Sequence, residues 1–207
     1  MKTKISFKKR IVSVILTVLL AVSALPITAF AAGDGEAEVI TANGSTINFN
    51  RYADAVEYAN KYGGTLRLLS DVEVPVPENP DDIPFITGEF TLDLNGRNIN
   101  EVVVGSVAFD EENEVIKGKP GTLTVTDSSS GGTIKYLTVN NGALTVAGGA
   151  ITDLEAESYA ATVNITGGTV EQLSLSDVVD EDISATISGG SVQWIRMSGG
   201  ALTVDGG

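Results

Sequence analysis

The sequence predicts an all-β protein built as a parallel β-helix, a solenoid of stacked coils. The pattern Gly-Gly-x-Φ-x-x-Φ-x-Φ, in which Φ is apolar, starts at Gly131, Gly148, Gly167 and Gly189. Short alternating strands, such as ALTV at 143–146, precede the glycine pairs. A unit this short cannot bury its own apolar face, so the copies must stack on one another.

The spacing of the copies indicates where the coils vary. The first glycines of successive pairs, counted to Gly206, are 17, 19, 22 and 17 residues apart. From the second copy onward the variation falls in one connection, at 140–143, 157–162, 176–184 and 198–201. Insertions at one point of a repeat emerge from one corner of a solenoid.

Alternation along each strand predicts which residues point into the core. We expect stacked inward columns from Ile134, Leu137, Val139, Leu144, Val146, Ile151, Leu154, Val163, Ile165, Val170, Leu173, Leu175, Ile187, Val192, Ile195, Met197, Leu202 and Val204. The glycine pairs predict a tight corner where a Cβ would clash or where φ must be positive.

The N-terminal residues predict a secretory signal peptide over 1–31. Five basic residues between Lys2 and Arg10 precede an apolar run from Ile11 to Leu25, and Ala29-Phe30-Ala31 fits a cleavage site. The run is shorter than the ~20 residues that a membrane-spanning helix needs. The sequence therefore predicts an exported protein, secreted or held at the cell surface, with no membrane segment after cleavage.

Three regions follow the predicted signal peptide. Residues 32–64 predict an N-terminal cap, with a strand and a helix from Arg51 to Tyr62, Asn50 as its N-cap and Gly63 at its end. Residues 65–120 predict irregular early coils with protruding loops at 75–84 and 109–119, and 121–207 the regular coils. The chain stops where the next apolar residue of the pattern should follow, which predicts a truncated C-terminal end with an exposed sheet edge.

Composition excludes several functional classes. Five of the 13 basic residues lie in the predicted signal peptide, which leaves 8 basic against 27 acidic residues, a net charge of −19. This acidity argues against nucleic acid as a partner. The absence of cysteine leaves packing and backbone hydrogen bonds to hold an exported fold together. The absence of histidine removes the usual general base near neutral pH.

The chain resembles the right-handed parallel β-helix proteins of the pectin-lyase-like superfamily, especially repetitive secreted and surface proteins of gut Firmicutes. The segments that carry this resemblance are GGTLRLLSDV at 63–72, FTLDLNGRNI at 90–99, GTLTVTDSSSGGTI at 121–134 and the later glycine-pair copies. The resemblance implies a right-handed coil. For the enzymatic members it implies a strand-borne carboxylate cluster with an arginine or lysine nearby.

The regular coils show no column of carboxylates that would indicate catalysis, so we predict no catalytic residue there. Asp93 and Arg97 flank the Asn95-Gly96 turn and are expected to serve that turn.

Two features could bind a ligand. Carboxylates from two neighbouring coils could coordinate Ca²⁺, namely Asp177, Asp180, Glu181, Asp182 and Glu157, although a solvated acidic loop is the alternative. Tyr136 and Trp194 share one repeat position and could stack on sugar rings, although packing against the local corner is the alternative.

These features favour a surface module, a structural stalk or an adhesin, with a polysaccharide or a host or cell-surface glycan as partner. The alternative is a polysaccharide lyase or hydrolase whose active site lies in 65–120 or beyond Gly207.

Overall fold

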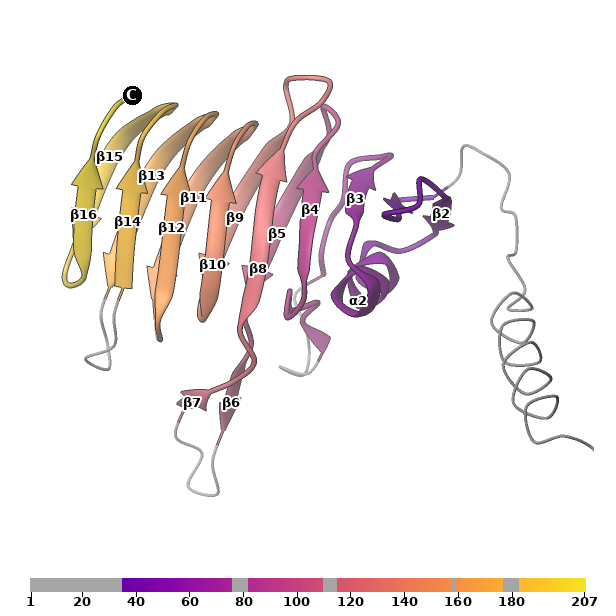
Figure 1. Cartoon of the computed structure of the whole chain (residues 1–207), viewed down its shortest axis with the longest axis horizontal. Helices are drawn as coiled ribbons and strands as arrows, with labels where there is room; N and C mark the ends of the chain where they lie inside the picture. The colour runs from indigo at the N-terminus through magenta and orange to yellow at the C-terminus, as the bar shows by residue number, and fades with distance from the viewer. Residues whose placement is uncertain (1–34, 76–81, 110–114, 158, 177–182) are drawn as a thin grey trace, which may run out of the picture. The chain divides into compact units, whose positions relative to one another are not determined.

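The computed structural model of this 207-residue chain describes residues 35–75, 82–109, 115–157, 159–176 and 183–207. The predicted signal peptide lies outside these ranges. The predicted fold class is confirmed: the chain forms a β-solenoid of about 4 turns with one short helix (Figure 1). Among the described residues, no helix combines the length and hydropathy that crossing a bilayer requires.

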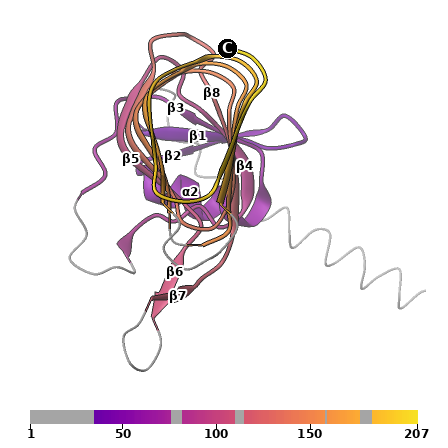
Figure 2. The ribbon, with the colours of Figure 1, turned by 90° about the vertical axis from the view of Figure 1, so that its left-hand side faces the viewer.

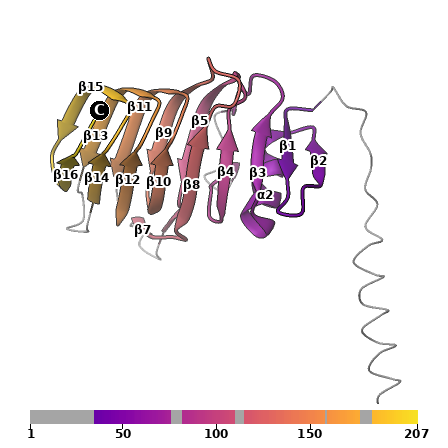
Figure 3. The same ribbon diagram turned by 45° about the horizontal axis from the view of Figure 1, so that its top comes forward.

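Two sheets form the walls of the solenoid (Figures 1 and 3). The nine-stranded sheet has the order β16 (Ala201–Val204), β14 (Ile183–Ile187), β12 (Ala161–Ile165), β10 (Gly142–Val146), β8 (Gly121–Thr126), β4 (Glu89–Asp93), β3 (Thr65–Leu68), β1 (Ala37–Ile40) and β2 (Thr46–Phe49). The five-stranded sheet has the order β15 (Ser191–Met197), β13 (Thr169–Ser176), β11 (Ala150–Glu157), β9 (Thr133–Val139) and β5 (Asn98–Val104). From β3 to β16, every strand pair in these sheets is parallel.

The glycine pairs occupy the corner where the chain passes from the nine-stranded to the five-stranded sheet. A Cβ at Gly167 would lie 2.4 Å from the carbonyl oxygen of Ala147 in the preceding coil. Gly168 has φ +71°, and its Cβ would lie 2.6 Å from the carbonyl oxygen of Gly149. Both reasons predicted for these glycines therefore hold, because coils stack too closely here for a side chain and the turn is left-handed.

The predicted inward columns form the core. Ile134, Ile151, Val170 and Val192 are register partners on successive strands, and the first three are at most 2% exposed. In the last coil the apolar residues keep this register but lose burial, because β15 and β16 have a neighbouring strand on one side only. The exposed ones there are Ile195, Met197 and Val204.

A hairpin and a helix cover the N-terminal end of the stack. Strands β1 and β2 form an antiparallel hairpin, and β1 also pairs antiparallel with β3. Helix α2 (Tyr52–Tyr62) buries the predicted stripe of Ala55, Val56 and Ala59. The predicted N-cap was wrong by one residue: Arg51 is the N-cap and makes no side-chain cap. The carboxylate of Glu36 substitutes for a cap, because it accepts the backbone N–H of Tyr52 at 2.6 Å.

The variable connection is confirmed as the passage from the five-stranded to the nine-stranded sheet. Its longest described insertion lies between β5 and β8, where the sequence predicted a loop at 109–119. The structure corrects this prediction, because β6 (Val107–Phe109) and β7 (Val115–Lys117) pair as an antiparallel hairpin that projects from the stack (Figures 1 and 2). The segment 76–81 of the other predicted loop lies outside the described residues.

Candidate functional site

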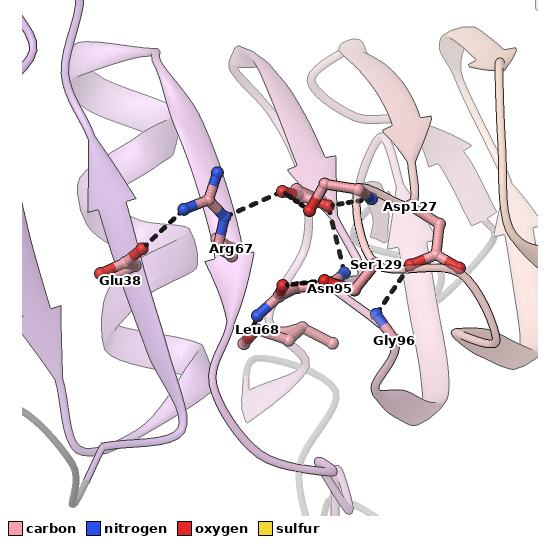
Figure 4. Close-up of polar contacts among 9 residues, drawn as sticks. Glu38, Arg67, Leu68, Asn95, Gly96, Asp127 and Ser129 are labelled. Carbon is pink, nitrogen blue, oxygen red and sulfur yellow. Dashed lines mark hydrogen bonds and ion pairs between the residues drawn. The ribbon is translucent and has the colours of Figure 1, made fainter.

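A cluster of hydrogen-bonded polar side chains spans the first coils on the nine-stranded sheet (Figure 4). Glu38, Arg67 and Asp93 are register partners on β1, β3 and β4. Arg67 donates from Nε to Asp93 Oδ2 at 2.9 Å and from Nη1 to Glu38 Oε1 at 3.2 Å. A carboxylate beside an arginine on adjacent strands is the arrangement that the resemblance to β-helix enzymes implies, so its chemistry has to be weighed.

The carboxylate of Asp93 is saturated with hydrogen bonds. Besides Arg67, its donors are the backbone N–H of Asn95 at 3.1 Å and both the N–H and the hydroxyl of Ser128, at 2.9 and 2.8 Å. Burial alone would raise the pKa of Asp93, but the hydrogen bonds from Ser128, Arg67 and Asn95 outweigh it and lower that pKa. At 3% exposure, Asp93 is not placed to reach a substrate.

Further side chains tie the turns of neighbouring coils together. Asp127 accepts the backbone N–H of Gly96 at 2.7 Å, and Asn95 donates to the carbonyl of Leu68 and accepts from Ser129 (Figure 4). Asn95 and Gly96 have φ +52° and +72°, as the turn prediction requires. The cluster therefore acts as a structural tie between the cap and the first coils, and the expectation that Asp93 serves the turn is confirmed.

The outer face of the five-stranded sheet carries the two predicted aromatic residues. They lie in one column, in which each residue is the register partner of the next: Glu101, Tyr136, Asp153, Gln172 and Trp194. Tyr136 is 47% exposed and Trp194 is 70% exposed. Trp194 lies on the end strand β15, which has a neighbouring strand on one side only, and sugar stacking by these residues stays a prediction.

The surroundings of the two rings differ. The ammonium of Lys135 lies over the ring of Tyr136, 4.9 Å from the ring centroid, as in a cation–π contact. On the strand next to Trp194, the amide of Gln172 donates to the hydroxyl of Ser174 at 3.4 Å. Tyr136 therefore presents a ring that is partly covered by a cation, whereas Trp194 presents an open indole.

Two hollows are lined by residues of the five-stranded sheet, and neither Tyr136 nor Trp194 is among their lining residues. Near Tyr136 a groove of about 580 Å³ is lined by residues that include Asp71, Asn98, Lys135 and Thr152. Toward the strand ends beyond Trp194, a smaller hollow of about 190 Å³ is lined by Glu155, Ser174, Leu175, Ser176, Arg196 and Ser198. These linings supply carboxylate, hydroxyl, amide and cationic groups.

Of the predicted calcium ligands, the structure describes only Glu157. Asp177, Asp180, Glu181 and Asp182 lie outside the described residues. Glu157 ends β11, where burial and then the neighbouring charge of Glu155 raise its pKa. Within the described ranges, no group of three or more acidic side chains is arranged to hold a metal ion.

Sequence reasoning missed two parts of these sites. The Glu38–Arg67–Asp93 contact depends on the register of three strands separated by irregular segments, which no repeat reveals. The hollow lined by Glu155, Ser174 and Arg196 was missed because it depends on how side chains of three strands pack, which the repeat pattern does not show. No protein-family model, curated protein or solved structure matches the chain.

Proposed function

We propose that this chain is a bacterial cell-surface or secreted module, a β-helix stalk or adhesin that binds glycans through the outer face of its five-stranded sheet. The observation that carries the proposal is the column containing Tyr136 and Trp194, two exposed aromatic residues on the outer face of one sheet. Aromatic rings offer apolar area to the C–H face of a sugar, and neighbouring carboxylate and amide groups can pair with its hydroxyls.

Export is supported by the predicted signal peptide over 1–31. Within this proposal, the pectin-lyase-like superfamily and its surface proteins of gut Firmicutes are the class in which we place the chain. N-terminal sequencing of the protein recovered from the medium or the cell wall of an expressing bacterium tests export. The expected first residue is Ala32, and an intact Met1 in a cytosolic fraction would contradict the proposal.

Glycan retention tests the binding face. Purified residues 32–207 are incubated with insoluble plant and host polysaccharides, and bound protein is measured after sedimentation. Trp194→Ala should reduce retention, because it removes the more exposed ring. Tyr62→Ala is the matched control, since Tyr62 is a 55% exposed aromatic on α2, away from this face. Equal retention of wild type and Trp194→Ala would remove this face from the function.

A further inference from the structure

We infer that the ligand is an uncharged, linear oligosaccharide that crosses the strands β9, β11, β13 and β15 and contacts Tyr136 and Trp194 together. This inference rests on the proposed glycan binding and names the class of glycan. Three features of the face carry it: the distance between the two rings, the polar groups between them and the sign of the surrounding charge.

The distance sets the length of the ligand. Tyr136 and Trp194 are three register steps apart in the column. Adjacent strands are ~4.8 Å apart, so the two positions are separated by about 14 Å along the stack. One sugar unit of an extended chain is comparable in length with one strand spacing, which is ~4.8 Å. A disaccharide therefore reaches one ring, whereas a chain of about four sugars reaches both.

The residues between the rings suit hydroxyl groups. Asp153 and Gln172 fill the two intermediate positions of the column and both are accessible. A carboxylate accepts two hydroxyl donors, and an amide both donates and accepts. Neighbouring positions of the column are one strand spacing apart, so a chain that spans the two rings meets a polar group under each middle sugar.

The charge of the face selects against acidic sugars. Its outward side chains include five carboxylates and two cations: Glu101, Asp153, Glu155, Glu157, Glu171, Lys135 and Arg196. The Lys135 ammonium already lies over the Tyr136 ring. A uronic acid chain would set its carboxylates beside those of the column, and like charges in contact oppose association. An uncharged chain meets no such repulsion.

Calorimetric titration of residues 32–207 tests the inference. The probes are cello-, manno- and chito-oligosaccharides of two to six sugars, with oligogalacturonates of equal length as the acidic comparison. We expect affinity for at least one uncharged series to rise with length up to about four sugars, since a chain held at two rings gains avidity. Tyr136→Ala and Trp194→Ala should each weaken hexasaccharide binding about three- to tenfold. The disaccharide should respond to only one of the two.

The outcomes separate this inference from the proposed function. Trp194-dependent binding that is as tight for two sugars as for six, or that ignores Tyr136→Ala, overturns the two-ring inference and leaves glycan binding intact. Tighter binding of oligogalacturonates overturns the choice of an uncharged ligand. Binding of none of these series overturns the inference and, together with a negative retention assay, the proposed function. Tyr62→Ala should match the wild type throughout.

Discussion

Replacing Asp93 with alanine should destabilise the fold by about 3 kcal/mol, the lower end of the range for breaking a buried ion pair. The substitution removes an acceptor of four hydrogen bonds and leaves the guanidinium of Arg67 without its shorter contact. The estimate is at the lower end because the Arg67 side chain is 34% exposed and can regain water. Asp93→Asn keeps an acceptor for the two backbone N–H groups, so it should cost less than Asp93→Ala.

Urea unfolding of residues 32–207, followed by circular dichroism at pH 7, measures this loss. Glu171→Ala is the control, because Glu171 is exposed on β13 and a surface change of this kind stays within about 0.5 kcal/mol. A loss below ~1 kcal/mol for Asp93→Ala would refute the view that the cluster ties the cap to the coils.

The loss of stability in Asp93→Ala should depend on pH. The folded state lowers the pKa of Asp93, so its charged form contributes stability that is present above the ordinary aspartate pKa of ~3.9. This contribution disappears as the pH falls through the lowered pKa. The difference between wild type and Asp93→Ala should therefore be the same at pH 7 and pH 5 and shrink only below about pH 4. A difference that already shrinks between pH 7 and pH 5 would contradict the assigned direction.

Three further changes probe the core, the corner and the acidic loop. Leu173→Ala should cost ~2–5 kcal/mol, because Leu173 is fully buried in an inward column, and a loss below ~1 kcal/mol would contradict that packing. Gly168→Ala should cost more than Gly131→Ala in the same unfolding assay, because both have positive φ but only Gly168 meets a backbone oxygen. If the predicted acidic ligands bind Ca²⁺, millimolar calcium should raise the melting temperature over that in chelator, and Glu157→Gln should reduce the rise. An unchanged transition leaves a solvated loop.

The regular coils could be predicted because one short pattern sets both faces and corners. Leu144, Val163 and Ala185 are partners on successive strands, and this register follows from counting between glycine pairs. The early coils have no regularly spaced glycine pairs from which the register could be counted. Their strands are joined by segments of unequal length, so the partnership of Arg67 with Asp93 depends on packing that the sequence does not repeat.

The candidate binding column was predictable in part. Equal repeat positions place Tyr136 and Trp194 in one column, and the register bears this out. Their exposure could not be derived in the same way, because it depends on the neighbours of each ring in the assembled stack. Trp194 lies on the end strand β15, which has a neighbouring strand on one side only, and the ammonium of Lys135 lies over the ring of Tyr136.

The corner that accepts insertions has a use in protein engineering. Gly142 and Ala161 are register partners at the starts of β10 and β12, so the connections before them lie side by side at one corner of the stack. Peptides grafted after Asn141 and after Ala160 would emerge with bases about 4.8 Å apart, although 19 residues separate the two sites in the chain. The solenoid would thus serve as a scaffold that displays unrelated peptides in a parallel row. The hydrogen bonds between adjacent strands would fix the spacing between the peptides.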